Sequence, residues 1–305
     1  MAPHPTNRNI DQKTTLVFLG LAFGLSWGMT GAYLGLGGPL RAPWIILLGV
    51  GFMAGPLMAA VIAQRWAARG PLKGPLALSW RLNRWWLVAW LAPVGLALAV
   101  TGASLLVPGV TLDWEMTHFL ERMRASMSPE DYQTMLHRQR ELPLHPLWLA
   151  LLQGLVAGPT VNALFGWFEE AGWRGLLFHL WRPMGFWNAQ AAIGMVWGLW
   201  HAPMVLWMGA NYPQHPVSGV LLMTVFTILL APLIGYIRLR SGSSIAAGVF
   251  HGSINAMGGV PLVVLSGGSD LSVGLTGAAG LMVLALAVGL LAWFDPHPTE
   301  SQTLR

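Results

Sequence analysis

Residues 147–180 read LWLALLQGLVAGPTVNALFGWFEEAGWRGLLFHL, and this stretch decides how the chain folds. About 20 consecutive, mostly apolar residues are enough to cross a bilayer as a helix. The only charged residues in the stretch are Glu169, Glu170 and Arg174. A charge at the bilayer centre costs about 2.5–3.5 kcal/mol or more and usually marks a functional site. The stretch is therefore expected to cross a membrane and to carry function there.

The composition of the whole chain indicates an integral membrane protein. Of its 305 residues, 54% are hydrophobic and only 10% are charged, whereas about 25% are charged in an average soluble domain. The net charge of +5 does not indicate nucleic-acid binding, because the basic residues lie in short segments between apolar stretches. Such segments are where orientation signals belong. The absence of cysteine excludes disulfides and thiolate catalysis.

We expect an all-α polytopic membrane protein with eight transmembrane helices. The predicted spans are residues 14–36, 43–64, 86–107, 147–181, 187–208, 217–238, 243–265 and 271–294. The fourth span is too long for one straight helix. We expect it to bend, or to begin as an interfacial segment, at Gly154, Gly158-Pro159 and Gly166.

The distribution of Lys and Arg predicts that both termini lie in the cytoplasm. If the spans alternate from an inside N-terminus, twelve of the 17 Lys and Arg fall at inside ends and five outside. Four of these five lie in one long loop, where they count less. This gives a cytoplasmic tail at 1–13, a membrane domain at 14–295 and a cytoplasmic tail at 296–305, in the plasma or inner membrane.

Two segments are expected outside the bilayer core. Residues 65–85 mix five cations with three tryptophans, which favours contact with anionic membrane lipids. The extracytoplasmic loop 108–146 holds six of the twelve acids. Within it, the run Ser128-Pro129-Glu130-Asp131 has the residues of a helix N-terminus. We expect one or two short helices there, serving as a solvated connector or as a lid.

Polar groups occur at one depth in three of the spans. Glu169 lies in the fourth, His201 in the fifth, and His251 and Asn255 in the seventh. Counted from the cytoplasmic ends at ~1.5 Å per residue, Glu169, His201 and His251 lie roughly 12–21 Å deep. Three helices that are separate in sequence thus deliver ionisable groups to one layer, which predicts a common site.

Helical spacing separates the roles of the charges in the fourth span. Glu170 and Arg174 are four residues apart, so they share a helix face and can form an ion pair. Glu169 is rotated by about 100° from Glu170 and has no such partner on its own helix. Glu169 is therefore the candidate reactive group. His251 and Asn255 are also four residues apart and are expected to point into the same space.

Two kinds of chemistry suit these residues. In the first, Glu169 and one histidine deprotonate a water molecule while the other histidine or Asn255 donates a hydrogen bond to the oxyanion. In the second, Glu169, His201 and His251 are the three protein ligands of a catalytic zinc ion. The residues alone leave the choice open.

The pattern resembles the CPBP family of intramembrane proteases, which includes the CAAX prenyl endopeptidases and the Abi proteins linked to bacteriocin self-immunity. The family shows E-E-x-x-x-R, F-x-x-x-H and H-x-x-x-N or D in this order. Here Glu169 to Arg174 and His251 to Asn255 match the first and third motifs. The second motif matches at His201 with Trp197 in place of the usual Phe, a change expected to matter little. The resemblance covers roughly residues 150–256.

The resemblance implies a conical, cytoplasm-facing chamber among eight helices, where a peptide bond of a membrane-associated protein is hydrolysed. It implies Glu169 as general base, His201 as its helper, and His251 and Asn255 as the oxyanion hole. We expect no cofactor, with Zn²⁺ as the alternative, and a substrate that is a CAAX-type prenylated protein or another membrane-anchored one. Other interpretations are a non-catalytic immunity or scaffold protein and a proton-coupled transporter. A transporter is expected to show inverted repeats, which the sequence does not display.

Overall fold

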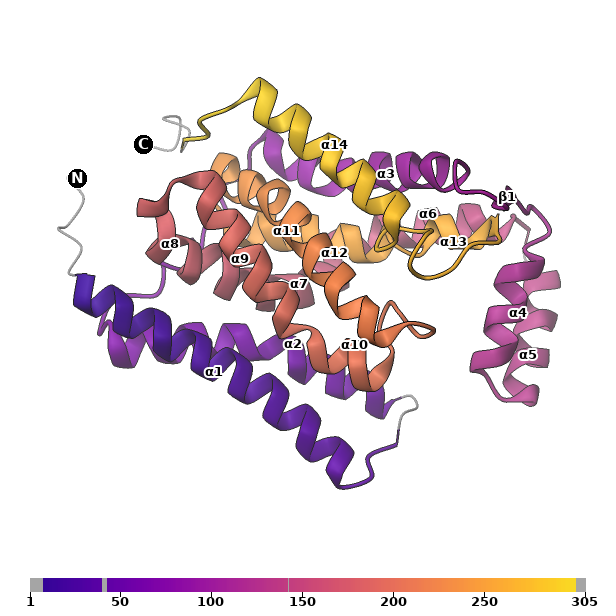
Figure 1. Cartoon of the computed structure of the whole chain (residues 1–305), viewed down its shortest axis with the longest axis horizontal. Helices are drawn as coiled ribbons and strands as arrows, with labels where there is room; N and C mark the ends of the chain where they lie inside the picture. Colours follow the sequence, from indigo (N-terminus) through magenta and orange to yellow (C-terminus); the bar gives the residue numbers. More distant parts are fainter. Residues whose placement is uncertain (1–7, 40–42, 142, 300–305) are drawn as a thin grey trace.

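The computed structural model describes residues 8–39, 43–141 and 143–299. Most of both predicted tails, together with Arg41 and Arg305, lies outside these residues. The described chain is a bundle of helices with a single small strand pair (Figure 1). The strands β1 (Thr111–Leu112) and β2 (Leu265–Ser266) pair antiparallel, with Thr111 opposite Ser266.

Six helical stretches among the described residues are long and apolar enough to cross a membrane. They are Asn9–Gly35, Trp44–Ala67, Arg84–Ser104, Pro146–Met184, Phe186–Met208 and Pro216–Ser241. The first three contain α1 (Arg8–Gly35), α2 (Trp44–Ile62) with the π-helical segment η1 (Ala63–Ala67), and α3 (Arg84–Ser104). The sixth is α11 (Pro216–Ser241). These six correspond to the first six predicted spans.

The predicted seventh and eighth spans are shorter than the sequence suggested. The seventh, expected at 243–265, is α12 (Ser244–Met257), followed by the single turn α13 (Val260–Val263). The eighth, expected at 271–294, is α14 (Ala278–Phe294). At ~1.5 Å per residue, α12 is only about 21 Å long. Nearly all of α12 is buried among other helices, so its length need not match the bilayer thickness.

The fourth span is divided into several helical segments. Its parts are α6 (Pro146–Ala157), the π-helical η2 (Gly158–Asn162), α7 (Ala163–Glu170), the π-helical η3 (Ala171–Leu177), α8 (Phe178–Trp181) and the 3₁₀ turn η4 (Arg182–Met184). The irregular segment η2 begins at Gly158-Pro159, as predicted, because proline lacks the N–H that a regular helix needs. The bends expected at Gly154 and Gly166 are absent, since these glycines lie inside the regular helices α6 and α7. The π-helical segment η3 begins directly after the acidic pair, where no irregular segment was predicted. Such π-bulges are frequent at functional sites.

The fifth span is interrupted at His201. Helix α9 (Phe186–Trp200) ends there and α10 (Ala202–Met208) begins. Pro203, in the first turn of α10, has no backbone N–H to continue the hydrogen-bond ladder of α9. His201 is thereby held at a break between two helices.

Glycines bring α7 and α12 into backbone contact. A Cβ atom on Gly248 would lie 2.6 Å from the Cβ atom of Trp167, and one on Gly166 would lie 2.9 Å from the carbonyl oxygen of Gly248. Such distances exclude any larger side chain at these positions without movement of the helices. The close approach sets the carboxylates of α7 beside the histidine of α12.

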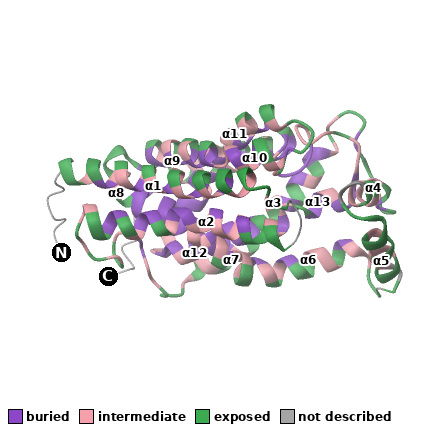
Figure 2. Cartoon of the chain, turned by 90° about the horizontal axis from the view of Figure 1, so that it is seen from below, coloured by how far each residue is buried: buried purple, intermediate pink, exposed green. Residues whose placement is uncertain are grey.

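The segment between α3 and α6 forms a helical hairpin that projects from one end of the bundle (Figure 1). Its helices are α4 (Thr117–Ser126) and α5 (Pro129–Arg140). As predicted, Ser128 caps α5: its Oγ atom accepts a hydrogen bond of 3.1 Å from the backbone N–H of Asp131. Figure 2 shows that α5 is largely exposed, whereas buried residues concentrate in the middle of the bundle.

The first residues of α1 and the last residues of α14 lie at the opposite end of the bundle (Figure 1). This end is covered by the irregular residues 68–83. The carbonyl oxygen of Ala77 accepts a hydrogen bond of 2.9 Å from the N–H of Ser244, and that of Ser79 accepts one from the Ser243 hydroxyl. The start of α12 is thereby fixed to the covering segment.

Candidate active site

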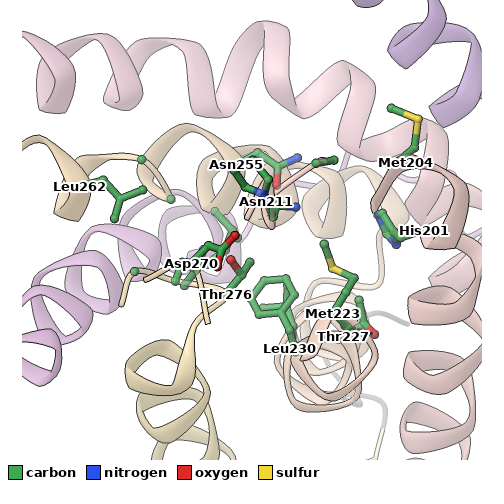
Figure 3. A pocket seen from close by; sticks show the side chains of 18 of the residues that line it. His201, Met204, Asn211, Met223, Thr227, Leu230, Asn255, Leu262, Asp270 and Thr276 are labelled. Atoms are coloured by element: carbon green, nitrogen blue, oxygen red, sulfur yellow. Dashed lines mark hydrogen bonds between the residues drawn. The ribbon is translucent and has the colours of Figure 1, made fainter. Parts of the chain in front are cut away.

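A cavity of about 640 Å³ contains four of the six predicted site residues. Glu169, His201, His251 and Asn255 all line it, and they come from α7, the α9–α10 break and α12. Figure 3 shows His201 and Asn255 on different segments around this space. The depth argument from the sequence thus agrees with the structure in bringing these side chains to one cavity. Glu170 and Arg174 do not line it; they are fully buried behind it.

The predicted ion pair on the fourth span is present. Arg174 Nη1 donates a hydrogen bond of 3.0 Å to Glu170 Oε1, and both side chains are inaccessible to solvent. The same Glu170 oxygen lies 2.8 Å from His251 Nδ1. Glu170 therefore bridges α7 to α12 as well as pairing along its own helix. Since a carboxylate accepts hydrogen bonds, the proton of this contact is assigned to Nδ1 of His251, which leaves Nε2 as the nitrogen not engaged by Glu170.

Glu169 is held by a residue on another helix. Trp197 Nε1 donates a hydrogen bond of 2.7 Å to Glu169 Oε2. Glu169 is only 2% exposed, so it meets solvent solely through the cavity that it lines. Among the described residues no hydrogen bond engages its other oxygen, Oε1, which is thus available to a water molecule. Glu169 is therefore the carboxylate of the pair that lines the cavity.

Trp197 also packs against Arg174, the ion-pair partner of Glu170. The Arg174 guanidinium carbon lies 4.4 Å from the centroid of the Trp197 ring, a cation–π geometry. The two histidines pack near the same ring, with centroid distances of 5.6 Å for His201 and 5.4 Å for His251. Trp197 therefore contacts Glu169, Arg174 and both histidines.

His201 is oriented by the helix that precedes it. Its Nδ1 atom lies 2.9 Å from the carbonyl oxygen of Trp197. A carbonyl can only accept, so Nδ1 carries the proton and Nε2 of a neutral ring has a free lone pair. This lone pair can accept a hydrogen bond from water. His201 is partly buried and lines the cavity.

Asn255 lies one turn beyond His251 on α12 and is exposed to the cavity. Its carboxamide can donate and accept hydrogen bonds. The spacing of four residues places it on the same face of α12 as His251, as the sequence predicts. Two potential donors therefore line one wall of the cavity.

The carboxylate and imidazole groups of this site are also of the kinds that bind metal ions. Among the described residues, no group of three or more His, Cys, Asp or Glu side chains is arranged to hold a metal ion. Glu169, His201 and His251 line one cavity but do not form such a group. His251 Nδ1 faces Glu170 and Glu169 Oε2 is bound by Trp197.

The structure shows one functional contact that the sequence reasoning underrated. Trp197 was expected to replace a phenylalanine with little consequence. Its indole N–H, which phenylalanine lacks, instead binds the candidate base. The indole N–H was visible in the sequence, but its partner was not, because Trp197 and Glu169 are 28 residues apart and meet only in the folded chain.

The rim of the cavity was not predicted either. It is built from α4, the α10–α11 loop and the loop before α14, and its polar residues are His118, Arg122, Asn211, Gln214, Ser269 and Asp270. Asp270 organises it by accepting hydrogen bonds from the backbone N–H of Gln214 at 2.7 Å and from His215 Nδ1 at 2.6 Å. These segments are far apart in the sequence, and no local pattern marks them as neighbours.

Comparison with known proteins places the central part of the chain in a family. Residues 143–257 match the family model described as type II CAAX prenyl endopeptidase Rce1-like. No curated protein matches the chain. The matched residues run from just before α6 to the end of α12 and include all six predicted site residues. Residues 143–257 are therefore similar to CAAX prenyl endopeptidases of the Rce1-like type, and they lie in a chain whose long apolar helices are typical of a multi-pass membrane protein.

Proposed function

We propose that the chain is an intramembrane endopeptidase with Glu169 as general base. Similarity to CAAX prenyl endopeptidases supports peptidase activity in general. The observation that carries the specific assignment is the asymmetry of the acidic pair. Glu170 is neutralised by Arg174 and holds His251, whereas Glu169 faces the cavity with one oxygen free. In this proposal α12 and α14 complete a bundle of eight helices around the cavity.

In the proposed reaction, a water molecule is activated between Glu169 and His201. Glu169 Oε1 takes a proton from the water, whose second hydrogen is accepted by Nε2 of His201. The water oxygen attacks the peptide carbonyl carbon and gives a tetrahedral intermediate. Glu169 then returns its proton to the leaving nitrogen, the C–N bond breaks, and the products are a carboxylic acid and an amine.

Two side chains of α12 stabilise the developing oxyanion in this proposal. Asn255 donates from its amide, and His251 donates from Nε2 when its ring is doubly protonated. In that form the Nδ1 contact with Glu170 becomes an ion pair. Removing one oxyanion donor typically costs about 10²–10³-fold in kcat. Arg174 and Glu170 are positioning residues here: they do not line the cavity, and they fix His251 and Trp197.

The experiment is a cleavage assay in proteoliposomes with a library of membrane-anchored peptides that carry a randomised segment. Wild-type protein is expected to release products, identified by mass spectrometry, while Glu169→Ala and His201→Ala fold normally and release none. Glu121→Ala, which removes a carboxylate from the exposed hairpin, is the matched control and retains cleavage. Undiminished cleavage by both site variants, or no cleavage of any library member by wild type, would contradict the proposal.

A chelator arm of the same assay tests the metal-free form of the proposal. We expect activity to be unchanged by EDTA. Loss of cleavage in EDTA with recovery on adding Zn²⁺ would favour the zinc-dependent alternative instead.

A further inference from the structure

A second hollow lies on the side of the bundle, between the neighbouring helices α3, α11 and α14 (Figure 1). This lateral groove has a volume of about 380 Å³ and shares no lining residue with the cavity of Glu169. Its lining side chains are aliphatic or aromatic, and only Trp85 and Tyr236 among them carry a polar group. The groove is open on its outer side, where Val88 and Gly95 are exposed.

Small residues leave the space between these helices. Ala92 and Gly95 on α3 and Ala287 on α14 line the groove, and a Cβ atom on Gly95 would meet no atom within 4 Å. From Trp85 to Leu96 the groove follows α3 for roughly 16 Å, at ~1.5 Å per residue. This is about half of the ~30 Å hydrocarbon core of a bilayer. An apolar groove of this length can hold one hydrocarbon chain.

One end of the lateral groove has an aromatic and cationic mouth. The rings of Trp85 and Tyr236 meet edge to face there, with their centroids 5.3 Å apart. The guanidinium carbon of Arg84 lies 5.6 Å from the centroid of the Trp85 ring, and that of Arg240 lies 5.0 Å from the centroid of the Tyr236 ring. Two guanidinium groups therefore flank the aromatic pair.

The charges at this mouth do not cancel. Arg240 forms an ion pair with Asp295, which also accepts a hydrogen bond of 3.0 Å from the Tyr236 hydroxyl. Arg84 is exposed, and no carboxylate among the described residues pairs with it. Trp and Tyr gather at the surface of a membrane, and arginines close to that surface attract anionic lipids. The mouth thus suits a phosphate group, as the groove suits an acyl chain.

We propose that the lateral groove binds an anionic membrane phospholipid. One acyl chain lies along α3 and packs on Phe250 of α12, and Arg84 binds the phosphate at the mouth through charge-assisted hydrogen bonds. Because Phe250 directly precedes His251, the bound chain stabilises the helix that carries two of the candidate site residues. The proposal does not depend on the endopeptidase function, and its test needs no cleavage.

A lipid titration followed by native mass spectrometry tests the role of the mouth. Delipidated protein in mild detergent would receive dioleoyl phosphatidylglycerol, which is anionic, or dioleoyl phosphatidylcholine, which has the same chains and no net charge. We expect one phosphatidylglycerol to bind more tightly than phosphatidylcholine. Arg84→Gln should weaken its binding by about fivefold, the effect of one arginine near a membrane surface. The control, Lys73→Gln, is exposed at the same end and should bind like wild type.

Equal affinity of the wild-type protein for both lipids would overturn the proposal, and so would an Arg84→Gln variant that binds phosphatidylglycerol as tightly as wild type. Tighter binding of an S-farnesylated cysteine peptide than of phosphatidylglycerol would instead assign the groove to the lipid anchor of a substrate. A dimer that Gly95→Leu dissociates would assign it to a second copy of the chain.

Filling the groove tests where the acyl chain lies. Gly95→Leu places a side chain in the groove, whereas Gly102→Leu adds the same group to α3 outside it, also with no atom within 4 Å of the new Cβ. Phosphatidylglycerol should raise the unfolding temperature of wild type and Gly102→Leu but not of Gly95→Leu, because a ligand of the folded state stabilises it. Undiminished binding to Gly95→Leu would overturn the proposal. If Gly95→Leu does not fold, Arg84→Gln, a change at an exposed side chain, decides the question.

Discussion

At the scale of single residues, the site depends on the different surroundings of two adjacent carboxylates. Glu170 lies between Arg174 and His251, and its Oε1 atom contacts both. Glu169 has only the Trp197 N–H and the cavity. The same residue type thus serves for structure at one position and, in our proposal, for chemistry at the next.

Trp197→Phe tests whether the indole N–H positions the base. The substitution keeps an aromatic ring but removes the donor to Glu169 Oε2, so the carboxylate loses its fixed orientation. We expect kcat to fall by about 10-fold with little change in KM, since even a 1 Å misplacement can cost about 10²-fold. The control is Trp200→Phe. It removes another buried indole N–H, which donates a hydrogen bond to the Ala22 carbonyl oxygen. Equal kcat values for wild type and Trp197→Phe would show that the N–H has no such role.

Glu170→Gln tests the structural half of the pair. The variant leaves Arg174 buried without a counter-charge, and breaking a buried ion pair in this way costs about 3–5 kcal/mol. We expect a clear fall in the thermal unfolding temperature in detergent, together with loss of cleavage because His251 is released. Glu130→Gln on the exposed hairpin should leave the unfolding temperature unchanged. A Glu170→Gln variant as stable as wild type would contradict a structural role for the ion pair.

At the scale of helices, the sequence predicted the six long spans and the bend at Gly158-Pro159, because apolar length and proline chemistry are local signals. It overestimated the seventh span by eight residues. The apolar run beyond Met257 continues, but it forms the α13 turn and the β2 strand, whose partner β1 lies over 150 residues earlier. Hydropathy reports that a residue avoids water and does not distinguish a lipid-facing helix from a packed loop.

Gly248→Ala tests the contact between α7 and α12. The added methyl would lie 2.8 Å from the Trp167 Cα atom, so the helices must separate and move His251 away from Glu170. Overpacking of this kind costs about 1–3 kcal/mol. We expect a lower unfolding temperature and lower activity. Gly289→Ala on α14, where no atom lies within 4 Å of the new methyl, should be tolerated, because alanine is the better helix former. If the two variants behaved alike, close packing at Gly248 would not be what holds the site together.

At the scale of the whole molecule, the sequence predicted that the site residues share one cavity, but it did not predict the rim through which that cavity is reached. Depth along three helices could be counted from local spacing, so Glu169, His201, His251 and Asn255 were correctly expected to lie together. The rim could not be found in this way, because α4, the α10–α11 loop and residues 267–276 meet only in the folded chain. The end of the bundle at which the cavity opens follows from that assembly.

Arg122→Ala tests whether the hairpin takes part in substrate binding. Arg122 lines the rim, and partial burial lowers the pKa of its guanidinium through desolvation. Removing a rim contact should raise KM by a few-fold and leave kcat nearly unchanged, because the reacting groups lie deeper in the cavity. Arg124→Ala, on the exposed side of the same helix, should change neither constant. A fall in kcat for Arg122→Ala would mean that the hairpin acts on the chemical step.

The most direct test of the central claim is the single-turnover cleavage rate of Glu169→Gln on a peptide that the wild-type protein cleaves. Glutamine keeps the size of the side chain and an oxygen that can accept the Trp197 hydrogen bond, but it cannot take a proton from water. Because general base catalysis contributes about 10²–10⁴-fold, we predict a loss of at least about 100-fold in rate with unchanged peptide binding. A Glu169→Gln rate within a few-fold of wild type would contradict the assignment of Glu169 as the base.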